Sequence, residues 1–381
     1  MSDALAANLS NESAPRSSQT STRAEATPLW IHRLAVSVAV LTFILICMGG
    51  IVKSLEAGLS VPDWPLSWGT PGKEIALSLA SLTALLGLAW AFTRVNALAW
   101  AAIASGCVLA GCYYLYGPNN GGTAWYTVPT VRAEHSHRLV AGTVGFLMFI
   151  LAGALWVRES RPSVRKLGFW ALIAVLVQAV LGGLTVHMQL PPLVSSGHGS
   201  LAQAFFALTI ILAVVTSPKW FEERPKLPQT DAVPLQKLTR NLAIAFYIQI
   251  VLGTAVRHTH YHTPGQPDNL SSFEWHTGAH LIGLLYVLHQ VAKTSLRVAR
   301  RHWDTPELAN PVKILLSLVG LQVLLGIGVL VLRILKLNED NELFQRQLTA
   351  TAHVGCGALC LATSVWLALR ANKFLEPGAA T

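Results

Sequence analysis

The sequence predicts an all-α polytopic membrane protein built from two pseudo-symmetric four-helix bundles, an eight-helix core, with an inserted two-helix hairpin. Three observations carry this prediction: the composition, a series of long apolar runs, and a motif that recurs within those runs. Of the 381 residues, 52% are hydrophobic and only 12% are charged. This balance, with a positive mean hydropathy, is too apolar for a soluble domain of this size.

About ten apolar runs are candidates for helices that cross a bilayer, which takes roughly 20 residues each. Two of the runs, 241–256 and 278–292, are short, so we expect their helices to extend into polar flanking residues. The full set is 33–52, 75–93, 97–116, 138–156, 167–186, 199–217, 241–256, 278–292, 312–332 and 350–369.

The ends of the chain and the loop charges predict how the protein lies in the membrane. Residues 1–29 lack an apolar core and a small-residue cleavage site, so we expect a disordered tail and not a signal peptide. Lys and Arg gather in alternate loops, which places both termini, including the tail 371–381, in the cytoplasm and the helices in the cell (inner) membrane. Because the net charge of +9 is divided among short loops, no nucleic-acid partner is expected.

A repeated motif organises the helices. A Gln followed three residues later by Leu-Gly occurs in VQAVLGGLTV (177–186), IQIVLGTAVR (248–257) and LQVLLGIGVL (321–330), and the first helix ends similarly in CMGGIVK (47–53) without the Gln. After each copy and its outward loop, a helix opens on histidine. These histidines are His137, His198, His276 or His280, and His353.

Four helix–loop–His-helix units, two per half, therefore predict the domain plan. The N-terminal half is 30–217, the cytoplasmic linker is 218–240, and the C-terminal half is 241–370. The segment 75–117 does not fit the repeat and is predicted to be the inserted hairpin.

Histidines at equivalent positions in membrane helices point to a cofactor. A single such His is as readily a hydrogen-bond donor between helices, but four at repeat positions favour ligation. Two imidazoles facing each other across a bundle suit haem iron, whereas zinc or copper wants three or four converging ligands. We therefore predict one bis-His haem site in each half.

The stretch AEHSHRLVAGTVG places an acid and a guanidinium beside the first of these histidines. Glu134 lies three residues before His137 and shares its helical face, and Arg138 is placed to meet a haem propionate. The alternatives are a helix N-terminal acid favoured by the dipole and an interfacial anchor, respectively. His135 is expected to face the loop.

The remaining histidines and the cysteines carry weaker signals. The cluster His258, His260 and His262 lies in a Pro/Gly-rich segment and is expected to be a solvated loop. The other histidines are expected to be structural or interfacial: His187, His289 and His302. All five cysteines lie inside apolar runs, so no disulfide framework is expected.

Four stretches closely resemble the haem A synthase family, over residues from about 30 to 370. They are GGIVKSLEAGLSVPDWPLSWG (49–69), EHSHRLVAGTVG (134–145), LGGLTVHMQLPPLVSSGHGSLAQAFFAL (181–208) and TAHVGCGAL (351–359). The resemblance implies an enzyme that oxidises the C8 methyl group of haem O to a formyl group by successive hydroxylations. It also implies a haem B prosthetic group in the second half and a role in cytochrome c oxidase biogenesis.

Residue by residue, the resemblance implies that His137 and His198 bind the substrate haem. It makes His353 and His276 the ligands of haem B, with His280 as the alternative to His276, and Glu134 the catalytic acid. Three departures are Lys53 in place of a small hydroxyl residue, the hairpin 75–117, and the lack of a loop cysteine pair.

The alternative function is a di-haem bis-His membrane electron carrier of the cytochrome b561 kind, which explains the paired histidines but not Glu134 or the PDWP string. A transporter with inverted repeats leaves the outward histidines unexplained. Expected partners are the haem O substrate and a membrane electron donor or acceptor, with a haem O synthase and a second copy of the chain as further candidates.

Overall fold

The computed structural model describes residues 26–61, 64, 119–120, 123–124, 127–222, 229–258, 270–334 and 340–373. The predicted hairpin 75–117, with its runs 75–93 and 97–116, lies outside the described residues, as do most of the tail 1–29, residues 223–228 of the linker and most of 371–381.

Long helices make up nearly all of the described chain, so the all-α prediction is confirmed for that part. Each of the eight predicted runs outside the hairpin region falls on one helix, and the two short runs extend into helices of 30 and 32 residues. The elements are α1 (Leu29–Ser54), β1 (Asn119–Asn120), β2 (Thr123–Ala124), α4 (Pro129–Arg158), α5 (Pro162–His187), α6 (Pro192–Val215), the 3-10 turn η2 (Pro218–Trp220), α7 (Gln229–His258), α8 (Leu270–Arg301), α9 (Pro306–Ile334) and α10 (Asp340–Lys373). The two-residue strands pair antiparallel.

Local sequence explains where several helices begin. Proline occupies the first position of α4, α5, α6 and α9, where its missing N–H costs no hydrogen bond and its fixed φ suits the helix. After α1 and α5 the chain turns through residues with positive φ, which side chains other than glycine rarely adopt: Glu56, Gln189 and Leu190. Both turns lie at the end of the helices that the loop charges predict to face outward, called the outward end below, and both are tightly bent.

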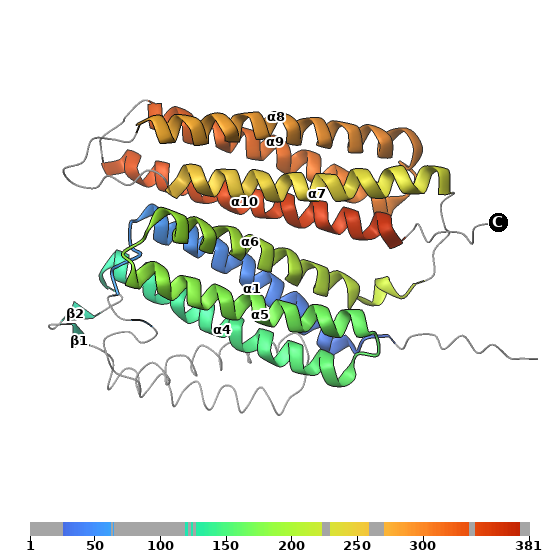
Figure 1. The fold of residues 1–381 in the computed structure, drawn as a ribbon, viewed down its shortest axis with the longest axis horizontal. Helices are drawn as coiled ribbons and strands as arrows, with labels where there is room; N and C mark the ends of the chain where they lie inside the picture. Colours follow the sequence, from blue (N-terminus) through green and yellow to red (C-terminus); the bar gives the residue numbers. More distant parts are fainter. Residues whose placement is uncertain are drawn as a thin grey trace, which may run out of the picture.

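The helices form two groups of four that lie against each other (Figure 1). In one group α1, α4, α5 and α6 pack in a ring, and in the other α7, α8, α9 and α10 do so. Helices α1 and α6 meet α7 and α10 along the seam between the groups. Pseudo-symmetry between the groups and a total of ten helices stay predictions.

Each group encloses its own apolar core, and a third cluster fills the seam. The seam cluster contains Ile46, Phe206, Ala358 and Ala362, and the Phe206 ring lies 6.0 Å from that of Phe43. Helix α10 contacts both groups, and small residues on it allow this close approach. The seam therefore brings α1, α6 and α10 into direct contact.

The outer surface is apolar, as expected for a protein embedded in lipid. Large side chains such as Leu193, Val157 and Ile282 are more than two-thirds exposed. Seven of the described helices are long and apolar enough to cross a membrane: α1, α4, α5, α6, α7, α9 and α10. Helix α8 turns polar Gln290 and Thr294 into the protein, which dilutes its apolar run. The chain is therefore a multi-pass membrane protein.

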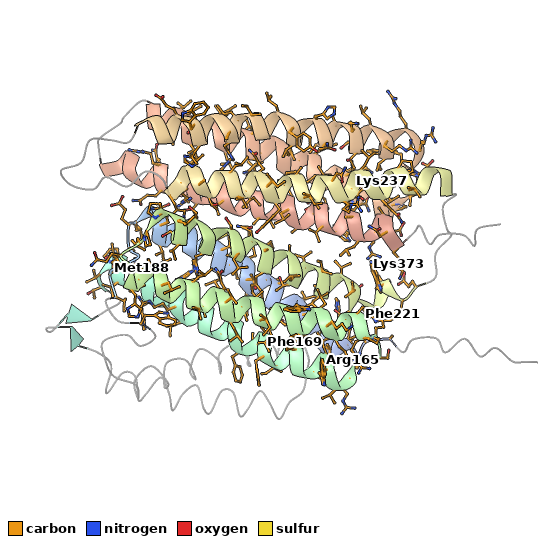
Figure 2. The ribbon with its side chains drawn as sticks, in the orientation of Figure 1. Arg165, Phe169, Met188, Phe221, Lys237 and Lys373 are labelled. Atoms are coloured by element: carbon orange, nitrogen blue, oxygen red, sulfur yellow. The ribbon has the colours of Figure 1, made fainter. Side chains whose placement is uncertain are left out.

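The described ends of the chain, the start of α1 and the end of α10, lie at one end of the helices (Figure 1). Basic side chains gather there too: Arg165, Lys237 and Lys373 are at this end, and Met188 is at the other (Figure 2). Lys373 also lies over the ring of Trp220, 4.7 Å from its centroid. A cytoplasmic location for this end stays a prediction from the loop charges.

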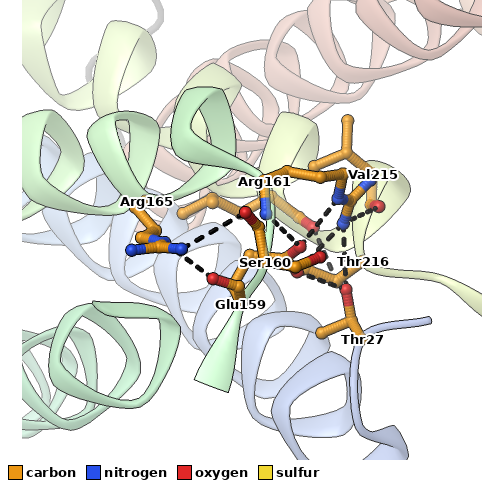
Figure 3. Close-up of polar contacts among 8 residues, drawn as sticks. Thr27, Glu159, Ser160, Arg161, Arg165, Val215 and Thr216 are labelled. Atoms are coloured by element: carbon orange, nitrogen blue, oxygen red, sulfur yellow. Dashed lines mark hydrogen bonds and ion pairs between the residues drawn. The ribbon is translucent and has the colours of Figure 1, made fainter. Parts of the chain in front are cut away.

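A polar cluster ties the first four helices together at the basic end (Figure 3). Glu159, between α4 and α5, is 2% exposed. Its two carboxylate oxygens accept hydrogen bonds from Nε and Nη2 of Arg161, at 2.7 and 3.0 Å. Thr27, just before α1, also donates to Glu159. Arg161 in turn donates to the carbonyl of Val215 at the end of α6, at 3.0 Å. One carboxylate thus links the ends of all four helices.

Acid should loosen this cluster. Burial acts to raise the pKa of Glu159, but hydrogen bonds from Arg161 and Thr27 outweigh it and hold the pKa below its ordinary value of 4.5. A carboxylate with a lowered folded pKa adds stability above its unfolded pKa, and that stability is lost as pH falls. We expect the melting temperature in detergent, followed by circular dichroism, to fall as pH drops below about 4.5.

Glu159→Gln tests the assignment, because it removes the charge and keeps the shape. At neutral pH it should cost about 1–3 kcal/mol, since Arg161 loses its charged partner, and its melting temperature should depend less on pH below 4.5. The exposed acid Glu274 supplies the matched control, Glu274→Gln. An unchanged acid profile in Glu159→Gln would contradict this account.

Candidate functional site

Four histidines each face a glycine of the preceding helix near the outward end. A Cβ placed on any of these glycines would come within about 3 Å of the imidazole, so the site depends on their lack of a side chain. The distances to the nearest ring atom are 3.2 Å for Gly49 and His137, 3.0 Å for Gly182 and His198, 3.1 Å for Gly253 and His280, and 3.0 Å for Gly326 and His353.

In each of its three occurrences, the glutamine of the repeated motif contacts the histidine that faces the glycine of that copy. Gln178 donates to the carbonyl of His198 at 2.9 Å, and Gln249 donates to that of His280 at 2.9 Å. Gln322 Nε2 lies 3.3 Å from His353 Nε2. The glutamine therefore helps to set the position of the His-bearing helix, a role that the sequence pattern alone did not reveal.

The structure brings the histidines together in two pairs, one in each group of helices. His137 lies on α4 and His198 on α6 of the first group, and His280 lies on α8 and His353 on α10 of the second. Nδ1 of His198 and Nδ1 of His353 are buried and accept or donate no hydrogen bond among the described residues. Each pair thus offers imidazole nitrogens inside an apolar helix bundle, a donor set that fits haem iron.

Within α8, the structure places His280 and not His276 at the position equivalent to the other histidines. His280 faces Gly253 and Gln249, and His276 lies one turn nearer the outward end of the helix. The sequence analysis prefers His276, with His280 as the alternative, whereas the function proposed below uses His280.

Glu134 is buried, 3% exposed, and it holds the outward loop onto α4. Its carboxylate accepts a hydrogen bond from the backbone N–H of Val61 at 2.8 Å and pairs with Arg138 one turn later. Arg138 also donates to the carbonyl of Val61 at 2.8 Å. The pair thus hydrogen-bonds to both the N–H and the carbonyl of Val61 in the GLSVPDWP string. These two hydrogen bonds hold the loop directly against α4.

The same loop packs on the turn between α5 and α6. A Cβ on Gly183 would lie 2.6 Å from carbons of the Trp64 ring, which also meets His187 edge to face at 6.3 Å. Gly58 lies against Leu190, one of the residues with positive φ. Despite the predicted insertion after it, the described part of the loop therefore covers the outward end of the first helix group.

Other predicted positions differ from expectation or stay apart from the pairs. His135 on α4 is 3% exposed, and the expectation that it faces the loop stays a prediction. His258 is the last residue of α7 and lies 4.0 Å from the Cβ position of Gly199, whereas His260 and His262 lie outside the described residues. Within the described residues, no three His, Cys, Asp or Glu side chains gather as a metal cluster.

Sequence reasoning missed a cation at the seam. Arg257, near the end of α7, donates to the carbonyl of Gly50 and to the Ser54 hydroxyl, both at 2.8 Å, and to the carbonyl of Ala350 at 3.3 Å. It therefore joins α7 to α1 and α10. The signal was present, since Arg257 ends its copy of the repeated motif where two other copies have the apolar residues Val186 and Leu330 and the first helix has Lys53.

Comparisons with known proteins find relatives of part of this chain. Residues 127–269 fit the family model described as cytochrome oxidase assembly protein. Heme A synthase from Exiguobacterium sibiricum is 33% identical over 139 residues, which cover 35% of this chain and 44% of that protein. Heme A synthase from Lysinibacillus sphaericus is 25% identical over 223 residues, or 54% of this chain and 71% of that protein. Heme A synthase from Symbiobacterium thermophilum is 31% identical over 131 residues, or 33% and 42%.

The similarity to the haem A synthase family predicted from the sequence is thus confirmed. For the first and third of these relatives, the chain matches less than half of their length. The matched residues include Glu134, His137, His198 and Arg257.

Proposed function

We propose that this chain, a relative of the haem A synthases, oxidises the C8 methyl group of haem O to a formyl group by successive hydroxylations. The product, haem A, would serve cytochrome c oxidase biogenesis. The observation that carries the proposal is that each helix group holds two histidines that each face a glycine of another helix. The confirmed family similarity supports the choice of this reaction over other haem chemistry.

The two halves take different roles in this proposal. His137 and His198 of the N-terminal half (30–217) hold the substrate haem O between α1, α4, α5 and α6. His280 and His353 of the C-terminal half (241–370) hold haem B, with His280 in place of the sequence-preferred His276. When bound, the haem group supplies reversible one-electron chemistry. The chain supplies the apolar slot, the ligands and their orientation.

The buried carboxylate of Glu134 supplies charge next to the substrate half. Fixed one turn before His137 by Arg138 and the Val61 N–H, it is oriented without any rearrangement at the moment of reaction. A preorganised negative charge stabilises positive charge that develops as electrons leave the methyl carbon, or accepts a proton from attacking water. Arg138 keeps this acid in place and remains a candidate for a haem propionate.

The covering loop and the surrounding lipid define how the substrate reaches the site. Val61 and Trp64 close the outward end of the first group, so we propose that haem O enters sideways from the membrane. The proposal keeps both termini in the cytoplasm, a membrane electron donor or acceptor as partner, and a haem O synthase or a second copy of the chain as further partners.

The test is chromatography of haems extracted from membranes that contain this chain together with a supply of haem O. We expect haem A to appear, and to be absent from the variant His137→Ala when matched for protein level. Accumulation of haem B alone, with ordinary reversible reduction, would replace this proposal with the di-haem electron carrier.

A further inference from the structure

The guanidinium of Arg257 lies in the seam between the two helix groups, partly buried among α1, α7 and α10. Its hydrogen bonds go to two backbone carbonyls and one hydroxyl, those of Gly50, Ala350 and Ser54. Among the residues that the structure describes, all of its acceptors are therefore neutral.

The nearby acids are used elsewhere in the described part of the chain. Glu134 pairs with Arg138 and Glu159 pairs with Arg161 at the far end. Glu56 interacts with Lys53, which adds a second positive charge close to Arg257. Among the described residues, no carboxylate hydrogen-bonds to Arg257 itself.

Removing a guanidinium from water is costly unless an anion compensates it. Neutral carbonyls satisfy its N–H groups, but they do not balance its charge. A carboxylate bound at this position would do so, and the planar fork of Arg is suited to take one bidentately. The seam therefore has the chemistry of an anion site.

The position of Arg257 relative to the histidine pairs identifies which anion fits. Arg257 follows Gly253, which faces His280, by one helical turn, and it donates to the carbonyl of Ala350, three residues before His353 on α10. Both histidines of the C-terminal pair are thus within its surroundings. A porphyrin held by that pair carries its own carboxylates on propionate side chains.

We propose that Arg257 binds a propionate carboxylate of the haem held by His280 and His353. The inference rests on the proposed function for the presence of that haem, but not on oxidation of haem O. The next residue, His258, lies 4.0 Å from the Cβ position of Gly199, which directly follows His198 of the other pair. Consecutive residues at the end of α7 therefore adjoin the two halves.

The experiment compares iron protoporphyrin with its dimethyl ester, in which both propionates are neutral. Both are titrated spectroscopically into the full-length protein bearing His198→Ala, which leaves the C-terminal pair intact. The unaltered Arg257 should favour the free acid over the ester by about tenfold or more. Arg257→Gln should weaken acid binding by a similar factor, leave ester binding unchanged, and thus erase the preference.

Two further variants make the test specific. Arg257→Lys should keep part of the preference for the acid, because it retains the charge without the fork. Arg132→Gln, at an exposed position near the same end of α4, should behave like the parent protein. The same titration in a His353→Ala background, which leaves the N-terminal pair, should show no effect of Arg257→Gln.

The proposal would be overturned if the ratio of acid affinity to ester affinity were equal in the parent and in Arg257→Gln. It would also be overturned if Arg257→Gln changed this ratio only in the His353→Ala background. Because the readout is haem affinity, a protein that binds haem as expected but makes no haem A would overturn the proposed function and leave this inference standing. If Arg257→Lys still binds haem, the weaker haem binding of Arg257→Gln does not reflect misfolding.

Discussion

Replacing Glu134 with Gln is expected to lower haem A formation by about 100-fold or more, since a preorganised charge at a reacting centre commonly contributes that much. The substitution keeps an oxygen that can accept from the Val61 N–H, so the outward loop should stay in place. Haem content should be unchanged, because the histidine pairs are intact. The measurement is haem A per chain in membranes supplied with haem O.

Two further variants separate the charge of Glu134 from its clamping role. Glu134→Ala removes the charge and the bond to Val61, so it should lose both haem A formation and thermal stability. Glu274→Gln, an exposed acid on α8, is the matched control and should behave as the parent. Full haem A formation in Glu134→Gln with loss in Glu134→Ala would leave Glu134 a purely structural role.

Replacing His280 with Ala is expected to remove the haem of the C-terminal half. This residue faces Gly253 and Gln249 and interacts with His353, so its loss leaves the iron with one protein ligand. Protein purified without a haem O supply should then contain less than one-tenth of the haem B of the parent. The measurement is haem per chain by the pyridine haemochrome spectrum.

His276→Ala is the matched comparison, because it alters a histidine on the same helix one turn away. It should retain the haem B of the parent. The opposite result, with loss of haem in His276→Ala and retention in His280→Ala, would restore the preference drawn from the sequence and show that α8 sits one turn differently with haem bound.

The sequence by itself determined the class of the protein, its described helices and its similarity to the haem A synthase family. Hydropathy identifies membrane helices because a spanning segment must satisfy its own backbone and bury its side chains in lipid. That signal is local, so it located each described helix. The stretch around Glu134 to Arg138 and the SSGHG stretch likewise resemble the family without reference to any distant residue, and the comparisons confirm that similarity.

Tertiary structure decided which of these residues meet. His276 and His280 are both candidates in the local sequence, and the packing of α8 on α7 places His280 against Gln249 and Gly253. Glu134 meets a loop 73 residues earlier in the chain, and Arg257 reaches α1 across 207 residues. Contacts of this kind depend on the relative register of separate helices, which periodicity within any one helix does not encode.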